Sequence, residues 1–298
     1  MINILILSAG TRDKVVQYFK EALAGKGKVI ATDCSPYAPA IYEADEYVLV
    51  PRITEPGYLD KILEICREKQ ITGVLSLIDP ELSLLADNKE RFLEIGTVPI
   101  VPDAKQVDIC FHKYAMYEAC KALGFATGRC FLDRKEFYRA VENGELTYPV
   151  FVKPESGSAS LDIHMAQDQE TVEFLCSRED GLMIQEFMNG QEYGADVYID
   201  MLSGEVISIF VKKKLKMRAG ETDKAESFRE EKLFALITDF VKKMGFRGII
   251  DIDLFEIDGN WYISEVNPRF GGGYPHAWAC GVRVPEMIVR NLEGQTNV

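Results

Sequence analysis

The first hundred residues alternate between short apolar runs and longer amphipathic segments. The apolar runs predict strands over 2–8, 28–33, 46–51, 73–78 and 98–102. Apolar residues at helical spacing predict helices over 12–24, 57–69 and 80–94. Strands and helices that alternate with short connections indicate a parallel sheet with helices on both faces. We therefore expect an α/β unit that ends near residue 105.

The pattern changes after a predicted helix over 107–123. Further helices are predicted over 168–177 and 229–244, and strands over 148–154, 162–166, 181–200 with one bend, and 206–218. Residues 248–267 predict a hairpin that turns at Asp258 and Gly259. The second half of the chain is therefore expected to be α+β, with antiparallel strands.

Composition narrows the class of protein. The net charge of −13 disfavours binding to a phosphate backbone, and no apolar run is long enough to span a membrane. The first apolar run has no basic segment before it and no cleavage site after it, so we interpret it as a buried strand rather than a signal peptide. Seven scattered cysteines without a C-x-x-C pair favour reduced thiols. We expect a cytoplasmic protein that binds neither nucleic acid nor membrane.

The segment "VFVKPESGSAS" ends an apolar strand with Lys153 and continues into a loop of small residues. Small residues let backbone N–H groups approach an anion, and a lysine adds a point charge, so the segment is compatible with phosphate binding. An ordinary hairpin loop with an edge lysine would have the same pattern. The basic run over 211–218 leaves two alternatives open as well, a solvated strand edge or a phosphate-facing strand.

The segment "IQEFMNGQE" places Gln185, Glu186 and Glu192 around a tight Asn-Gly turn. Its extended backbone could form hydrogen bonds with a purine edge, and a nearby carboxylate could hold ribose hydroxyls. A plain β-turn is the alternative. The turn after the first strand lacks G-x-G-x-x-G, which argues against a dinucleotide site of the Rossmann type.

The stretch "EVNPRFGGG" places Glu265, Asn267 and Arg269 two residues apart at the end of a predicted strand. Counting outward from the turn brings Asp253 close to opposite Glu265. Like charges across a hairpin are unfavourable unless a divalent cation lies between them, and oxygen ligands suit Mg²⁺ or Mn²⁺. A solvent-facing polar ribbon is the alternative, and the role of Asp251 stays open.

These three segments, in this order, resemble the ATP-grasp superfamily. Within it, "SAGTR", "IDPEL", "PVFVKP" and "EVNPRFGGGYPHAWACGV" resemble the single-chain subgroup similar to the carbamoyl phosphate synthase large subunit. The resemblance covers nearly the whole chain. It implies an α/β pre-ATP-grasp domain over 1–106, followed by a two-lobed ATP-grasp fold. The lid lobe would span 107–183, and the C-terminal lobe, with the metal site, 184–298.

The resemblance also implies ATP and Mg²⁺ as cofactors, with Mn²⁺ as an alternative metal. It assigns ATP-binding roles to Lys113, Lys153, Ser156, Gly157, Ser158, Ala159, Ser160, Gln185, Glu186, Met188, Glu192 and Lys214. The implied metal ligands are Asp253, Glu265 and Asn267. The implied catalytic residues are Arg269, Lys153 and Arg218.

The implied activity is a ligase reaction on small molecules. ATP phosphorylates a carboxylate, an amine or a thiol displaces phosphate from the acyl-phosphate, and in the amine case a C–N bond forms with release of ADP and phosphate. The alternatives are a carboxylate or carbamate kinase similar to one half of carbamoyl phosphate synthase, and a catalytically silent ATP-binding sensor. The resemblance also suggests a homodimer. The second substrate is expected near Ser8–Arg12, Asp79–Glu81 and 270–278, where Arg12 or Arg218 would hold its carboxylate.

Overall fold

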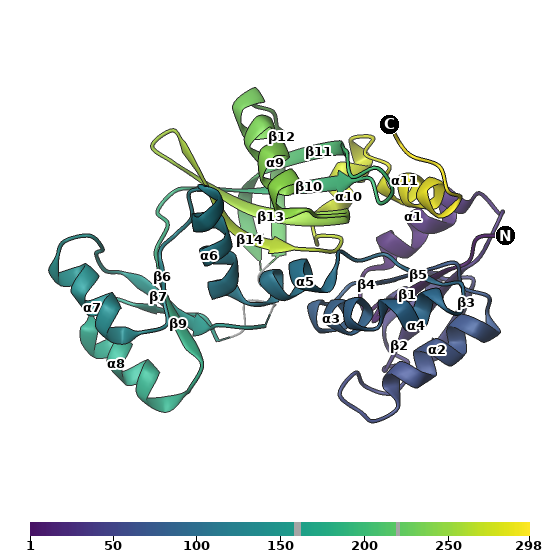
Figure 1. Cartoon of the computed structure of the whole chain (residues 1–298), viewed down its shortest axis with the longest axis horizontal. Coiled ribbons are helices and arrows are strands. Elements are labelled where there is room, and N and C mark those ends of the chain that lie inside the picture. The colour runs from purple at the N-terminus through teal and green to yellow at the C-terminus, as the bar shows by residue number, and fades with distance from the viewer. Residues whose placement is uncertain (158–161, 219–220) are drawn as a thin grey trace.

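The computed structural model describes residues 1–157, 162–218 and 221–298. Its N-terminal domain is a parallel sheet with the strand order β3-β2-β1-β4-β5 (Figure 1). The strands are β1 (Ile4–Leu7), β2 (Val29–Asp33), β3 (Glu46–Leu49), β4 (Gly73–Ser76) and β5 (Val98–Pro99). The helices are α1 (Asp13–Leu23), the short 3-10 helix η1 (Pro39–Glu43), α2 (Tyr58–Glu68), α3 (Asp79–Asp87) and α4 (Lys89–Leu93). The predicted parallel α/β unit is confirmed, although the helix predicted over 80–94 is two helices.

The near-continuous apolar runs of this domain follow from burial on both faces of the sheet. Ile4 and Ile6 of β1 belong to the hydrophobic cluster that includes α1, whereas Leu5 and Leu7 belong to the cluster that includes α2. Successive side chains of a strand point to opposite faces, so both sets must be apolar when helices cover both faces. None of the helices in the described residues is long and apolar enough to cross a membrane.

The chain leaves this domain through two helices, α5 (Ala104–Phe111) and α6 (Lys113–Leu123), so the prediction of one helix over 107–123 is wrong. His112 separates them with an extended backbone. Its imidazole lies 2.8 Å from the Glu155 carboxylate, and the Lys113 N–H donates to the Glu155 carbonyl at 2.9 Å. The helix breaks because the backbone here pairs with the segment that follows β7 (Val150–Pro154).

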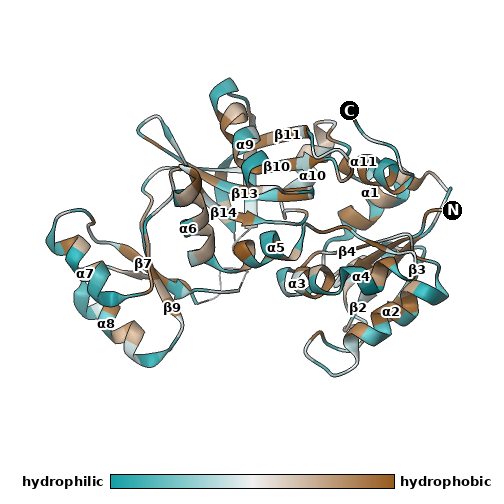
Figure 2. Ribbon diagram, viewed as in Figure 1, coloured by the Kyte–Doolittle hydropathy of each residue, from teal (hydrophilic) through white to brown (hydrophobic). Residues whose placement is uncertain are grey.

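The lobe at the far end of the molecule from the N-terminal domain holds an antiparallel sheet with the order β6-β9-β7-β8 (Figure 1). Its strands are β6 (Cys130–Phe131), β7 (Val150–Pro154), β8 (His164–Ala166) and β9 (Leu182–Glu186). Its helices are α7 (Arg134–Glu142) and α8 (Gln169–Arg178), which present hydrophilic surfaces to solvent (Figure 2). Phe137, Val150, Val172 and Ile184 belong to its hydrophobic core.

The central sheet is antiparallel with the order β12-β11-β10-β13-β14. Its strands are β10 (Gln191–Ile199), β11 (Val206–Arg218), β12 (Glu221–Phe228), β13 (Gly248–Ile257) and β14 (Asn260–Asn267). Helix α9 (Glu231–Met244) contributes Leu233 and Phe240 to the hydrophobic cluster that contains Val197 and Ile252 of this sheet. Because side chains alternate along a strand, the opposite face is free to carry polar groups.

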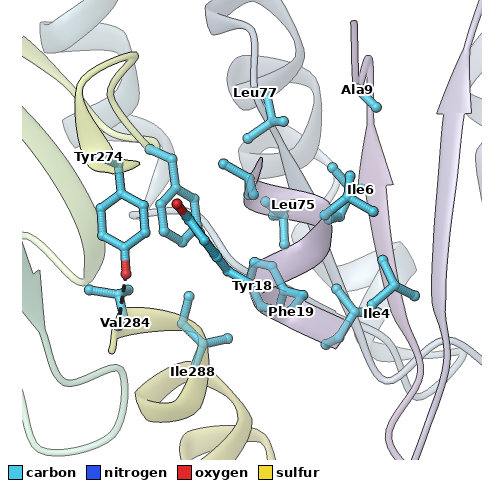
Figure 3. Close-up of a cluster of buried hydrophobic side chains, with 14 of the residues drawn as sticks. Ile4, Ile6, Ala9, Tyr18, Phe19, Leu75, Leu77, Tyr274, Val284 and Ile288 are labelled. Carbon is cyan, nitrogen blue, oxygen red and sulfur yellow. Dashed lines mark hydrogen bonds between the residues drawn. The ribbon is translucent and has the colours of Figure 1, made fainter. Parts of the chain in front are cut away.

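The C-terminal helices α10 (Tyr274–Ala279) and α11 (Val284–Leu292) pack against the N-terminal domain. Tyr18 and Phe19 of α1 and Tyr274 of α10 belong to one apolar cluster (Figure 3), and Tyr18 stacks on Trp278 with the ring centroids 4.1 Å apart. The Tyr274 hydroxyl accepts a hydrogen bond from the Val284 N–H at 3.0 Å. The segment after the central sheet therefore fixes that sheet against the first domain.

Candidate active site

One face of the central sheet carries charged and amide side chains on four neighbouring strands. They are Glu192 and Asp196 of β10, Lys212 and Lys214 of β11, Asp251 and Asp253 of β13, and Glu265 and Asn267 of β14. The residues between them, such as Ala195, Val211, Ile252 and Val266, belong to the core under α9. The period-2 alternation of a half-buried strand therefore gathers these polar groups on one surface.

The two predicted metal-binding carboxylates lie opposite each other across the β13–β14 hairpin. Asp253 pairs with Glu265, and Asp251 pairs with Asn267 two residues away. The position that we predicted for Asp253 by counting from the turn is thus confirmed. Burial raises the pKa of the Asp253 carboxyl to about 7, with a lysine acting against this shift and the neighbouring carboxylates Asp251 and Glu265 acting with it.

That lysine is Lys214, which lies between two carboxylates. Its ammonium is 2.6 Å from the Asp253 carboxylate and 2.7 Å from that of Glu192. Burial alone would lower the pKa of Lys214, but these carboxylates outweigh it and hold the pKa above its ordinary value. Glu192 and Lys214, both predicted to bind ATP, and the predicted metal ligand Asp253 are therefore in direct contact.

The donor set suits a hard divalent cation. Asp253, Glu265 and Asn267 offer carboxylate and amide oxygens, which Mg²⁺ prefers over nitrogen or sulfur ligands. No group of three or more His, Cys, Asp or Glu residues suited to a metal occurs in the described part of the chain. An ion held here would therefore need further oxygens from a ligand or from water, as Mg²⁺ sites commonly do.

Arg269 lies next to these oxygens and is held by an aspartate of the N-terminal domain. Its Nε and Nη2 donate to the two carboxylate oxygens of Asp79 at 3.0 and 3.2 Å, and Nη2 also lies 3.2 Å from the Asn267 amide oxygen. Burial alone would lower the pKa of Arg269, but the carboxylates of Asp79 and Asp251 outweigh burial and hold the pKa above its ordinary value. The guanidinium therefore stays charged. A fixed cation thus adjoins the predicted metal ligands.

Two predicted phosphate-binding lysines come from the other side of the site. The Lys113 ammonium donates to the Gly157 carbonyl at 2.7 Å, so it contacts the loop after β7. Burial lowers the pKa of Lys153, with Glu265 acting in the opposite direction. Ser156 is exposed, and Ser158, Ala159 and Ser160 lie outside the described residues. Lys113, Gly157, Glu265 and Asn267 line one small pocket together with Asp79 and Cys110.

The predicted adenine-binding residues lie where β9 leads into β10. Gln185 is buried in β9, and the Glu186 N–H donates to the Arg129 carbonyl at 2.9 Å. The Glu186 carboxylate accepts from the Arg129 N–H at 3.0 Å. Met188 is buried between the strands, beside Gly128. These residues form a short connection between the lid lobe and the central sheet, a few residues before Glu192.

The comparison with protein families identifies this architecture. Residues 110–273 match the profile of the ATP-grasp domain, and residues 4–101 match the PylC-like N-terminal domain. The chain belongs to the ATP-grasp family. Its two antiparallel sheets with the site between them are thus the ATP-grasp fold, and the parallel sheet is the domain that precedes it.

Individual relatives are distant. The chain is 27% identical over 192 residues to D-alanine–D-alanine ligase of Ruminiclostridium cellulolyticum, covering 54% of this chain and 51% of the ligase. It is 22% identical over 258 residues to the arginine-specific large chain of carbamoyl phosphate synthase of Geobacillus stearothermophilus, covering 82% of this chain and 24% of the synthase. The chain thus spans about half the length of the first relative and about a quarter of the second.

A solved structure extends the likeness of the fold to the whole chain. The biotin carboxylase domain dimer of Hydrogenobacter thermophilus 2-oxoglutarate carboxylase, in complex with MgADP, ADP and bicarbonate, superposes with a TM-score of 0.76 at 17% identity. The match covers 99% of this chain and 70% of that chain. At this identity the likeness shows the fold alone.

Some predicted residues of this ATP-grasp chain lie elsewhere or have structural partners. Arg218 is exposed at the end of β11, and no hydrogen bond joins its side chain to a described residue of the site. Glu81 is fully buried and accepts hydrogen bonds from the hydroxyls of Ser8, Tyr58 and Ser76, so it holds the first domain together. It does not line the pocket that Asp79 lines.

Sequence reasoning missed two residues of the charged face, Lys212 and Asp196, and it expected Asp79 near the second substrate without predicting its contact with Arg269. Lys212 donates to Asp196 at 2.5 Å, and Asp79 holds Arg269. Lys212 could have been found, because it is two residues before Lys214 and shares its face. Asp196 could have been found in the same way, because it lies an even number of residues after Glu192 on β10 and so shares its face. Asp79 is 190 positions from Arg269, so no local pattern in the sequence connects the two.

Proposed function

We propose that this ATP-grasp protein is an ATP- and Mg²⁺-dependent ligase that joins a small-molecule carboxylate to an amine or a thiol through an acyl-phosphate. The observation that carries the proposal is the placement of Asp253 directly opposite Glu265, with Asn267 and the Asp79-bound Arg269 beside them. Oxygen ligands for a divalent cation next to a fixed guanidinium are what transfer of a phosphoryl group requires from a protein.

The nucleotide would lie along the charged face of the central sheet. Met188 and the end of β9 would contact the base, Glu192 the ribose, and Lys113, Lys153 and Lys214 the phosphates. Asp253, Glu265 and Asn267 would hold Mg²⁺, which when bound supplies positive charge to the phosphate oxygens. Lys214 would then exchange part of its contact with Asp253 for a phosphate oxygen. The reason is that an ammonium and a divalent cation on one carboxylate repel each other.

The chemistry follows from these positions. A carboxylate oxygen of the substrate attacks the γ-phosphorus, and the bond to the bridging oxygen breaks, so that ADP leaves with the electron pair. Lys153 and Arg269 would balance the negative charge that spreads over the transferring group. The amine or thiol then attacks the acyl carbon, loses its proton and displaces inorganic phosphate. Closure of the lobe that carries β7 would exclude water, which would otherwise hydrolyse the acyl-phosphate.

The comparisons support a ligase without identifying its substrates. One relative is named for joining two D-alanine molecules, and the other for carbamoyl phosphate synthesis. This chain matches only part of each, so the activity of either protein is not transferred as a whole. We infer an amino acid or a related small molecule as the carboxylate substrate.

Release of ADP by the purified chain tests this proposal. The chain would be incubated with MgATP and a panel of amino acids and other small carboxylates, alone and with amines or thiols. We expect ADP release that depends on both partners, and loss of that release in Asp253→Asn. Asp239→Asn is the matched control, because it removes a carboxylate that is exposed on α9 and paired only with Lys243 among its described neighbours. No stimulation by any pair of compounds would contradict the proposal. Acyl-phosphate trapped by hydroxylamine without ligated product would instead identify a carboxylate kinase.

A further inference from the structure

Half of the hydrogen bonds of the Arg269 guanidinium go to a residue outside the ATP-grasp domain match. Nε and Nη2 donate to Asp79, Nη2 also donates to Asn267, and Nη1 donates to the Phe270 carbonyl at 3.2 Å. Arginine has five N–H groups, so these four hydrogen bonds leave one N–H of Nη1 without a partner among the described residues. Asp79 supplies two of the four acceptors.

The pair is well shielded from water. The side chains of Arg269 and Asp79 are 13% and 10% exposed. A bidentate contact between a guanidinium and a carboxylate fixes the plane of the guanidinium, not only its position. Without Asp79, the remaining hydrogen bonds of the Arg269 side chain to described residues are to Asn267 and Phe270, which are two and one positions away in the sequence. The orientation of Arg269 thus depends on the first domain.

The position of Asp79 is itself fixed by a buried hydrogen-bond network. Asp79 begins α3 after a two-residue connection from β4, and Glu81 lies in the same first turn. The Glu81 carboxylate is fully buried and accepts from the hydroxyl of Ser8 at the end of β1, at 2.6 Å. It also accepts from Ser76 of β4 and from Tyr58 of α2. The turn that carries Asp79 is therefore attached to two strands and one helix of the parallel sheet.

We propose that Asp79 is a positioning residue of the phosphoryl-transfer site, and that Glu81 holds the turn from which Asp79 acts. The N-terminal domain then orients Arg269, in addition to any part it has in binding the second substrate. This inference rests on the proposed function, because it takes Arg269 as the cation that faces the transferring phosphoryl group. The Nη1 N–H that has no partner among the described residues is the group left for that contact.

A phosphoryl mimic tests the inference without knowledge of the second substrate. The probe is MgADP with aluminium fluoride, which imitates the phosphoryl group in transfer, and the measurement is the dissociation rate of bound ADP with and without aluminium fluoride. In the wild-type protein we expect aluminium fluoride to slow dissociation. In Asp79→Asn we expect that slowing to fall about tenfold, as for a misplaced catalytic group, with the affinity for MgADP alone unchanged.

Two further variants separate positioning from folding. Asp60→Asn removes another Asp–Arg pair of the same domain, the exposed pair with Arg91, and should leave the aluminium fluoride effect unchanged. Glu81→Gln should reduce the effect less than Asp79→Asn and should lower the melting temperature, because Glu81 acts through the turn. Asp79→Glu keeps the charge and should restore part of the effect.

The outcomes distinguish this inference from the proposed function. If aluminium fluoride slows ADP release equally in wild type and Asp79→Asn, Asp79 is not a positioning residue although the ligase proposal stands. If Asp79→Asn weakens MgADP alone by the same factor, Asp79 supports the fold of the site rather than Arg269. A wild-type protein that binds MgADP without any response to aluminium fluoride would overturn both proposals.

Discussion

Lys212 and Lys214 lie two residues apart on β11 and share one face of the sheet, yet their surroundings differ. The Lys212 side chain is 2% exposed and donates to Asp196, which is fully buried, with Asp251 4.0 Å away. The Lys214 side chain is 6% exposed, but its partners Glu192 and Asp253 are 28% and 26% exposed. One lysine is enclosed with its partners, whereas the other has partners that water and ligands can reach.

The glycines of "EVNPRFGGG" account for the enclosure. A Cβ atom on Gly273 would lie 3.0 Å from the Lys212 ammonium, and one on Gly271 would lie 2.5 Å from the Asp251 carboxylate carbon. The loop after Arg269 therefore packs its backbone directly on Lys212 and Asp251, which together with Asp196 we call the Lys212 group. On the same face of the sheet, the Lys212 group thus stabilises the fold, whereas Lys214 with Glu192 and Asp253 is accessible to a ligand.

The largest expected effect comes from removing the enclosed lysine. Lys212→Met would leave Asp196 and Asp251 close together without their cation, and one oxygen of Asp196 already lacks a hydrogen-bond partner among the described residues. Loss of one member of a buried charge pair costs about 3–5 kcal/mol in the free energy of unfolding. Urea unfolding would measure it, with Lys213→Met as the matched control, because Lys213 lies between the two lysines on the opposite face and is one-third exposed.

A loss no larger than that of Lys213→Met would contradict the comparison. It would mean that water or a rearranged loop takes the place of the Lys212 ammonium. The Lys212 group would then be as open as the Lys214 group.

The second expected effect tests the loop that covers the Lys212 group. Gly271→Ala would place a methyl group against the Asp251 carboxylate, so either the loop or Asp251 must move. Overpacking of this kind costs about 1–3 kcal/mol in the free energy of unfolding. The same unfolding measurement in a Lys212→Met background should give a smaller additional loss, since the two changes disturb one group of contacts. A fully additive loss would show that the loop and Lys212 act independently.

Much of this comparison could be predicted from the sequence. The resemblance to the ATP-grasp superfamily assigned Lys214 to ATP binding, and the Asp258–Gly259 turn predicted the register that brings Asp253 opposite Glu265. The basic run over 211–218 was left between a solvated strand edge and a phosphate-facing strand. The structure shows that β11 is not an edge strand, because β12 pairs with it, but residues 215–218 are exposed to solvent. Strand β12 has few apolar residues, so its hydrophobic pattern gave no signal.

The contacts between distant segments could not be predicted. Asp79 meets Arg269, and Gly273 packs on Lys212, only because the C-terminal helices return to the first domain. The break at His112 had no local signal either, since residues 107–123 keep an apolar stripe through it. In each case the deciding contact joins segments far apart in the chain, and hydrophobic periodicity reports only on neighbours within one element.

The third expected effect concerns the accessible lysine, where stability should change little and ligand binding should change more. In Lys214→Met, water can reach Glu192 and Asp253, so the loss should be about 1 kcal/mol in the free energy of unfolding. Mg²⁺ alone should raise the melting temperature of the variant more than that of the wild type, because the ammonium no longer occupies Asp253. The affinity for MgADP is the second readout. If Mg²⁺ stabilises both proteins equally, Lys214 does not compete for the proposed metal site.

The smallest expected effect comes from the residue beneath both lysines. A Cβ atom on Gly194 would lie 3.0 Å from Cε of Lys212 and 3.3 Å from Cε of Lys214, so both side chains would have to shift by a few tenths of an ångström. Gly194→Ala also removes the freedom of a glycine within a strand, which stabilises by about 0.5–1 kcal/mol and offsets part of that cost. We therefore expect a change within about 1 kcal/mol in urea unfolding. If Lys212 is the rigid member of the pair, Gly194→Ala should cost less in the Lys212→Met background than in the Lys214→Met background. The opposite order would show that Lys214 is the more constrained of the two.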